Sequence, residues 1–213
     1  MLYSFMGERA RYQPLTREDK ITVVLYRIGI FLSTLTVCIS AILAIMGLRY
    51  PEVLNNRVIS SGLALDILLL IFYLGVGLSV FFIHLYVGKF HRVLKKIYYV
   101  AVPCLAVLFL AGKGNPAVPL LSGQSYETLL LIPVSLCLGF VTAKEAFCFQ
   151  LVEGYILALL MPACLFFYSV GALSRQTAVY ALGLIAGLLV LFIFRKVFMP
   201  LDFDIGDKSA YQP

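Results

Sequence analysis

Residues 142–150, TAKEAFCFQ, lie between two apolar runs at residues 128–143 and 155–173. A lysine, a glutamate and a cysteine this close together would suggest an active site in a soluble enzyme. If both runs instead cross a membrane, one straight helix through them would be roughly 67 Å long at about 1.5 Å per residue. The hydrocarbon core of a bilayer is about 30 Å thick. The chain must therefore turn between Ala143 and Tyr155, which predicts two antiparallel membrane helices joined at the membrane surface.

The amino-acid composition indicates that lipid is the solvent for this fold. Of the 213 residues, 62% are hydrophobic and 13% are charged, and the mean hydropathy is +0.96. A soluble domain carries about 25% charged residues, and a chain of this length has too much surface to bury so many apolar side chains in one core. We therefore expect an all-α polytopic transmembrane bundle. The first twenty residues have no apolar stretch typical of a cleavable signal peptide.

Six apolar segments are candidates for membrane spans. They are residues 21–48, 63–87, 97–112, 128–143, 155–173 and 177–194. A spanning helix needs about 20 apolar residues, so the third and fourth segments are marginal. Each of these two holds a proline, Pro103 or Pro133, which membrane helices tolerate. The predicted organisation is an N-terminal cytoplasmic tail (1–20), a six-helix transmembrane domain (21–199) and a C-terminal cytoplasmic tail (200–213).

The distribution of basic residues predicts the orientation of the bundle. With six spans, twelve Lys and Arg residues fall on the side of the two termini and four on the other side. The twelve are Arg9, Arg11, Arg17, Lys20, Lys89, Arg92, Lys95, Lys96, Lys144, Arg195, Lys196 and Lys208; the four are Arg49, Arg57, Lys113 and Arg175. Because basic residues concentrate on the cytoplasmic side, we expect both termini in the cytoplasm, or in the stroma of a thylakoid. No recognition motif accompanies these charges, so nucleic-acid binding is not expected.

Two motifs concern the helices themselves. The sequence TRED at residues 16–19 predicts a capping box, in which the threonine hydroxyl accepts a hydrogen bond from a backbone N–H one turn on. The first helix is therefore expected to begin before the membrane. Gly183 and Gly187 form a GxxxG motif, which allows two helices to approach closely. The second helix belongs either to this chain or to the partner in a homodimer.

A group of ionisable residues is predicted near the cytoplasmic leaflet. Its members are Arg27, His84, His91, Lys144, Glu145 and Glu153. An arginine inside a span needs a partner or must extend to the surface, so we expect Arg27 either to pair with Glu145 or Glu153 or to snorkel. Each of His84 and His91 is expected to bond to a neighbour, or alternatively to ligate the magnesium of a chlorophyll or the iron of a haem.

Catalysis and transport find less support in the sequence. The chain contains no GxSxG, HExxH or P-loop motif, no ligand spacing indicates a metal site, and Cys148 has no histidine base at a known spacing. Ion-coupled transporters keep ionisable groups near the membrane midplane, and no span holds one there. A small-molecule transporter or channel is the second hypothesis, and a polar cavity between the second, fourth and fifth segments would favour it. A membrane enzyme using Cys148 or Glu145 is the third.

Four stretches carry a resemblance to a known family. They are VLYRIGI at residues 24–30, IHLYVGKFHR at 83–92, KEAFCF at 144–149 and DIGDKS at 204–209. In combination they resemble a family of uncharacterised integral membrane proteins found mainly in cyanobacteria. The resemblance implies a six-helix protein in the thylakoid or plasma membrane of a photosynthetic organism. It brings no established activity, cofactor or catalytic residue.

The leading hypothesis is a non-enzymatic accessory or assembly protein that binds subunits of a photosynthetic membrane complex. The acidic C-terminal tail follows the basic end of the last segment, so it is expected to fold back on that end or to dock a partner. Residues expected to form the interaction surface are Arg27, Lys144, Glu145, Cys148, Glu153, Asp204, Asp207 and Lys208. Chlorophyll binding through the two histidines extends the same hypothesis.

Overall fold

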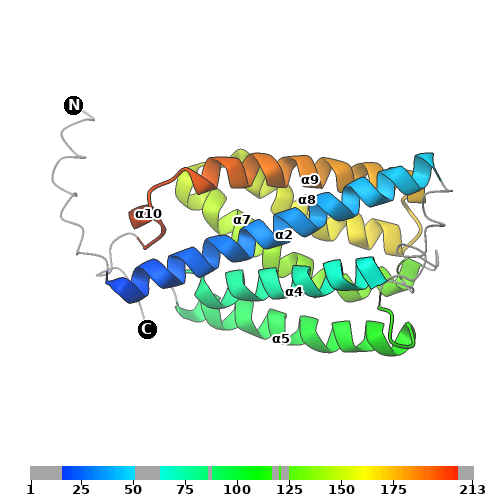
Figure 1. The fold of residues 1–213 in the computed structure, drawn as a ribbon, viewed down its shortest axis with the longest axis horizontal. Coiled ribbons are helices and arrows are strands. Elements are labelled where there is room, and N and C mark those ends of the chain that lie inside the picture. Colours follow the sequence, from blue (N-terminus) through cyan, green and yellow to red (C-terminus); the bar gives the residue numbers. More distant parts are fainter. Residues whose placement is uncertain (1–15, 51–62, 86–87, 117–119, 121–124, 206–213) are drawn as a thin grey trace.

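Six helices of this chain are long and apolar enough to cross a membrane. The computed structural model describes residues 16–50, 63–85, 88–116, 120 and 125–205. In chain order the helices are α2 (Arg17–Arg49), α4 (Leu63–Phe82), α5 (Gly88–Ala111), the 3₁₀ helix η2 (Ser125–Leu131), α7 (Ile132–Phe149), α8 (Val152–Ser169), α9 (Arg175–Val197) and the short α10 (Asp202–Ile205). The predicted all-α transmembrane bundle is confirmed (Figure 1).

The two marginal segments both form spans of full length. α5 and the span Tyr126–Phe149, which joins η2 to α7, contain 24 residues each. α5 is longer than the predicted apolar segment of residues 97–112, because the helix already begins at Gly88. The added first turns carry basic residues. Pro133 lies in the first turn of α7, where a backbone N–H has no intrahelical acceptor, so the proline removes no helix hydrogen bond. Pro103 lies inside α5.

The turn predicted within residues 143–155 occurs at Gln150. This residue caps α7 in the left-handed conformation, with φ 55° and ψ 42°, and its backbone N–H donates to the carbonyl of Ala146. The Leu151 N–H donates to the same carbonyl at 3.2 Å, and α8 starts at the next residue. α8 then packs closely against α7. A Cβ on Gly154 would lie only 2.5 Å from the carbonyl oxygen of Thr142.

The start of α2 shows the predicted capping box. The Asp19 N–H donates to the Thr16 hydroxyl at 3.2 Å, and the Thr16 N–H donates to the Asp19 carboxylate at 2.8 Å. Two backbone donors that the helix leaves free are thereby satisfied. The helix begins at Arg17, before the apolar segment, as predicted.

A close helix crossing in the bundle is made by two Gly-x-x-x-Ser pairs. Gly29 and Ser33 on α2 face Gly75 and Ser79 on α4, and these two helices share the most extensive contact in the structure. A Cβ on Gly29 would lie 2.6 Å from the Gly75 carbonyl oxygen, and one on Gly75 would lie 2.9 Å from the Gly29 carbonyl oxygen. Each serine hydroxyl donates to the carbonyl of the glycine one turn earlier. Small residues are what allow two backbones to meet in lipid.

The GxxxG motif on α9 is only partly used within the chain. A Cβ on Gly183 would lie 3.3 Å from Cδ1 of Ile45 on α2, whereas one on Gly187 would meet nothing within 4 Å. Intramolecular packing thus accounts for Gly183, and Gly187 lies on an open face.

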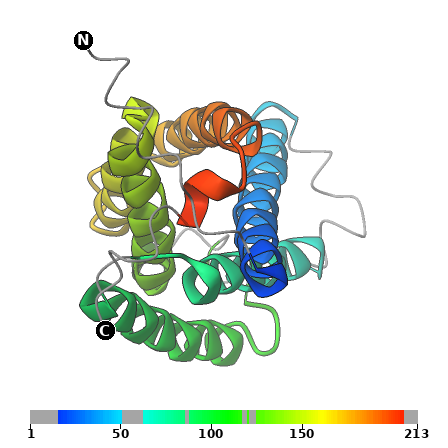
Figure 2. The same cartoon turned by 90° about the vertical axis from the view of Figure 1, so that its left-hand side faces the viewer.

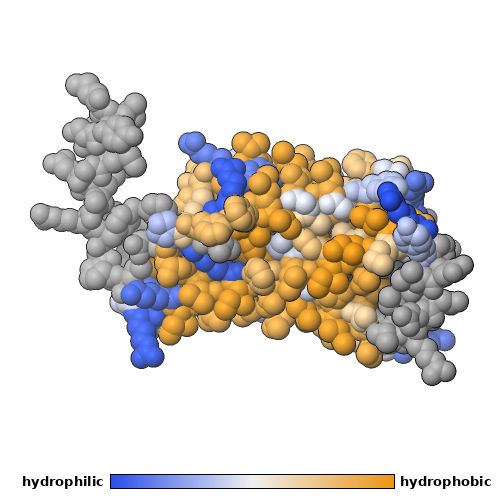
Figure 3. Space-filling model, turned by 45° about the horizontal axis from the view of Figure 1, so that its top comes forward, coloured by the Kyte–Doolittle hydropathy of each residue, from blue (hydrophilic) through white to orange (hydrophobic). Residues whose placement is uncertain are grey.

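The helices form a ring that α10 enters from one end. Seen from that end, α10 lies between α2, α7 and α9, and α5 lies on the outside (Figure 2). α5 packs on α4, α7 and η2. On the face that Figure 3 shows, apolar side chains cover the middle of the molecule and hydrophilic side chains gather towards the two ends. Because α10 packs against α2, residues 202–205 belong to the bundle rather than to a separate tail.

The α2–α4 crossing generates a test. We expect Gly29→Ala to destabilise the protein by about 1–3 kcal/mol, because the added methyl overpacks a backbone contact. Gly187→Ala is the matched control, since it makes the same change on a helix with free space. Thermal unfolding in detergent micelles measures both. Equal midpoints for the two variants would contradict the described crossing.

Candidate functional site

A buried carboxylate, Glu145, lies at the centre of a charge network at one end of the bundle. Its side chain on α7 is fully buried. Oε1 accepts hydrogen bonds from the Tyr26 hydroxyl at 2.6 Å and from Lys144 Nζ at 2.8 Å. Oε2 forms an ion pair with Lys196 of α9. Glu145 therefore links α2, α7 and α9 near the start of α2 and the C-terminal ends of α7 and α9.

Lys196 continues the network to α10. Its side chain is 1% exposed, and Nζ pairs with Asp204 as well as with Glu145. The same Nζ lies 4.2 Å from the centroid of the Phe149 ring, a cation–π contact that stabilises a desolvated ammonium group. A lysine buried to this degree needs such partners, because an unpaired charge inside a protein is strongly disfavoured.

Arg27 clamps the connection between α9 and α10. Nε donates to Asp204 Oδ2 at 2.7 Å, Nη1 donates to the Met199 carbonyl at 2.8 Å, and Nη2 donates to the Pro200 carbonyl at 3.0 Å. These bonds hold the chain folded back over the basic end of α9. Asp204 is thus shared by two cations from two different helices.

The predicted pair of Arg27 with Glu145 or Glu153 is wrong. Lys144 and Lys196 pair with Glu145, and Arg195 contacts both oxygens of Glu153 at 2.9 Å. The reason is the folded-back tail, which places Asp204 next to the guanidinium group. Arg27 and Glu145 still belong to one network, because Asp204 and Lys196 lie between them.

The two histidines do not present Nε2 to a pigment. His84 Nε2 lies 3.3 Å from the Thr22 hydroxyl oxygen, and that hydroxyl donates to the carbonyls of Glu18 and Asp19. This arrangement favours the tautomer in which His84 Nε2 is the donor, and the buried Nδ1 has no hydrogen-bond partner among the described residues. His91 Nε2 lies 3.1 Å from the Val80 carbonyl oxygen, so it also donates. A magnesium or iron ligand needs an unprotonated nitrogen with open space, so the Nε2 arrangement does not fit.

His84 is neutral in this environment. Burial is the main cause that lowers the pKa of His84, and the nearby Lys144 lowers it further. Asp204 and Asp19 act in the opposite direction and raise the pKa, without reversing the net shift. The imidazole therefore borders the charge network without adding a charge to it.

The remaining predicted site residues lie elsewhere. Cys148 is exposed at the end of α7, and the described hydrogen bonds of the histidines go to Thr22 and Val80 rather than to its thiol. Within the described ranges, no three His, Cys, Asp or Glu side chains are grouped to hold a metal. Asp207 and Lys208 lie outside the described residues, so their role stays a prediction.

Sequence reasoning missed two members of the network. Tyr26 looks like one more aromatic residue of the first span, yet its hydroxyl is a donor to Glu145. Lys196 was counted with the basic residues of the cytoplasmic side, yet it is buried. The signal that was available is the adjacent pair Tyr26-Arg27 inside an apolar run, since two polar groups in one helical turn within lipid call for partners.

The network predicts unequal effects for two identical substitutions. We expect Glu145→Gln to cost about 3–5 kcal/mol, because it leaves buried Lys196 without one of its charge partners. Glu153→Gln is the control, and we expect about 1 kcal/mol or less because its partner Arg195 is 46% exposed and can turn to water. Thermal unfolding in the same detergent compares them. A loss for Glu153→Gln as large as that for Glu145→Gln would contradict the central position of Glu145.

Comparisons with known proteins place the chain among membrane proteins of unknown activity. An "Uncharacterized protein" of Haemophilus influenzae is 41% identical over 88 residues, which are 41% of this chain and 51% of the relative. The chain thus matches about half the length of this curated relative, and no solved structure matches it. Residues 78–212 match the family described as "Uncharacterized integral membrane protein (DUF2301)". Because the match covers more than half of the chain, the protein belongs to this DUF2301 family of integral membrane proteins.

Proposed function

We propose that this chain is a non-enzymatic accessory or assembly protein, which holds a larger membrane complex together through its helices and its cytoplasmic face. The observation that carries the proposal is the use of the charged side chains. Glu145 is occupied by Tyr26, Lys144 and Lys196, and Glu153 is occupied by Arg195. Groups engaged in this way fix the shape of a surface, whereas a catalytic acid or base must be reachable by a substrate.

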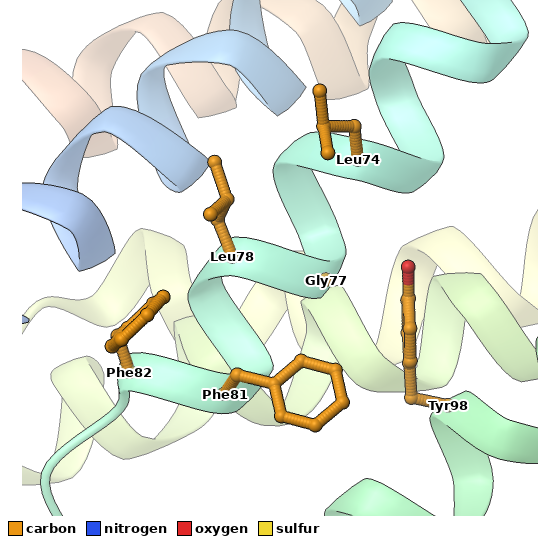
Figure 4. Close-up of a pocket in the computed structure, with 6 residues that line it drawn as sticks. All are labelled: Leu74, Gly77, Leu78, Phe81, Phe82 and Tyr98. Atoms are coloured by element: carbon orange, nitrogen blue, oxygen red, sulfur yellow. The ribbon is translucent and has the colours of Figure 1, made fainter.

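The packing of the helices favours this proposal over transport. A transporter keeps its binding site between helices near the midplane. The larger of the two described pockets has a volume of about 420 Å³ and is an open groove on the outside, lined by residues of α4 and α5 (Figure 4). The α2–α4 crossing leaves no room even for a methyl group. A transporter or channel for a small solute is therefore the second candidate function.

The proposed setting is a plasma membrane. The family resemblance suggested a photosynthetic complex, with chlorophyll bound by the histidines. A relative in Haemophilus influenzae supports a plasma membrane instead, and the bonded Nε2 atoms of His84 and His91 favour an accessory role without pigment. Co-purification of photosynthetic subunits from the native membrane would instead support a photosynthetic complex.

We further propose that both termini lie in the cytoplasm, as the twelve-to-four distribution of basic residues indicates. Fusions of green fluorescent protein and of alkaline phosphatase to the C-terminus test this in bacterial cells. We expect fluorescence without phosphatase activity, because phosphatase folds only outside the cytoplasm. A fusion after Arg49 at the opposite end of α2 is the control and is expected to give the reverse. Phosphatase activity from the C-terminal fusion would overturn the orientation.

Purification from the native membrane tests the accessory role. The tagged protein, extracted in mild detergent, is expected to co-purify with a stoichiometric membrane partner on a native gel. Asp204→Asn is expected to reduce that partner severalfold, because it releases α10 from the cytoplasmic face, whereas Glu18→Gln at an exposed position on the same side is expected to retain it. Extraction of the variants in equal amounts and in monodisperse form controls for folding.

One result would contradict the accessory role, and another would change its setting. A protein that migrates alone or as a homodimer would move transport to the front. An absorption spectrum with bound chlorophyll would restore the photosynthetic form of the proposal.

A further inference from the structure

An apolar groove faces the lipid between α4 and α5. It is lined by Leu74, Gly77, Leu78, Phe81, Phe82 and Tyr98. Leu74 is 58% exposed and Phe81 is 38% exposed, so the groove opens outwards. The one polar group in its wall, the Tyr98 hydroxyl, donates to the Tyr73 carbonyl at 3.0 Å. The occupant that this wall accepts is therefore a hydrocarbon chain.

The groove results from the way in which α5 is held. The Tyr98 ring lies over Gly77, and a Cβ at Gly77 would clash with its hydroxyl. Tyr98 and Phe81 pack edge to face with their centroids 5.7 Å apart (Figure 4). Only 17% of the residues in the apolar stretch of α5 are buried inside the protein, against 44% for the span that contains α7. The aromatic contact thus holds α5 against α4 at one wall of the groove, while most of α5 stays open to the lipid.

Basic side chains surround the cytoplasmic end of this groove. The first turns of α5 carry Lys89, Arg92, Lys95 and Lys96. Lys95 Nζ lies 5.6 Å from the centroid of the Phe81 ring, directly at the groove. None of these four side chains has an ion pair within the described part of the chain, whereas Lys144, Arg195 and Lys196 at the same end are all paired. The α5 cations are thus available to an anion from outside.

The spacing of charge and groove matches an amphipathic ligand. From Phe81 to Leu74 the groove follows two turns of α4, roughly 10 Å by helix rise. Such a path suits an extended acyl chain, and its Phe81 end lies beside the ammonium group of Lys95. An anionic headgroup at a basic membrane-facing site gains about 1 kcal/mol for each Lys or Arg near the surface.

We propose that the α4–α5 groove is a binding site for an anionic phospholipid, with the phosphate at Lys95 and Arg92 and an acyl chain along Leu74, Leu78 and Phe81. The site is independent of the proposed accessory role, because it requires only this chain and its bilayer. Free inorganic phosphate lacks the hydrocarbon that the groove accepts. A zwitterionic lipid fills the groove but leaves the basic residues without net compensation.

The absence of tryptophan from the sequence makes a direct test feasible. Phe81→Trp places a single fluorophore in the groove and retains an aromatic ring for Lys95. Phe194→Trp is the matched control, because Phe194 is 64% exposed on α9 and its neighbours Arg195 and Lys196 already have carboxylate partners. Each variant is reconstituted in mixtures with dibrominated phosphatidylglycerol or dibrominated phosphatidylcholine, and quenching of the fluorophore gives the relative binding constant of the two lipids.

We expect the Trp at position 81 to prefer phosphatidylglycerol at least about fivefold, which corresponds to one basic residue near the membrane surface. The Trp at position 194 is expected to show no preference. Adding Lys95→Gln to the groove variant is expected to abolish most of the preference, whereas adding Lys20→Gln, on another helix of the same leaflet, is expected to preserve it. Equal quenching by the two lipids at position 81, or a preference unchanged by Lys95→Gln, would overturn the site and show ordinary annular lipid only.

Discussion

A carboxylate stays ionised inside a protein only where donors replace the water that it has lost, and Glu145 is such a carboxylate. Its three partners come from α2, α7 and α9, so satisfying this one group fixes the positions of three helix ends. Lys196 then needs a second anion, which brings α10 into the bundle. The arrangement of this end of the bundle follows from these successive requirements. A different position for any of these helices would leave a buried charge without a partner.

The bundle uses two kinds of interaction that remain effective in lipid. The hydrophobic effect does not drive helices together there, because lipid tails are as apolar as leucine. Close backbone packing takes over where Gly29 of α2 meets Gly75 of α4, and buried ion pairs take over at the end of the bundle that holds Glu145. α5 has little of either. α5 borders a groove towards the lipid, and its four basic side chains have no ion pair among the described residues.

The features that depend on local sequence were predictable, and those that depend on tertiary geometry were not. Hydropathy located all six spans, bilayer thickness located the turn at Gln150, and the TRED motif located the start of α2. The partner of Arg27 was missed because Asp204 is 177 residues away in the chain, and several carboxylates on the same side were equally plausible. The GxxxG motif drew attention to α9, while the most extensive helix contact uses Gly-x-x-x-Ser pairs that look ordinary in sequence.

The position of Asp204 imposes an order on the synthesis of the protein. Arg27 lies in α2, and its carboxylate partner follows 177 residues later. At a bacterial elongation rate of about 5–20 residues per second, that interval is roughly ten to thirty seconds. During this time the guanidinium group must be solvated by water or lipid phosphate at the surface, as a snorkelling arginine is. The end of the bundle that holds Glu145 and Lys196 therefore closes only after the chain has been made as far as α10, whatever the speed at which the individual helices insert.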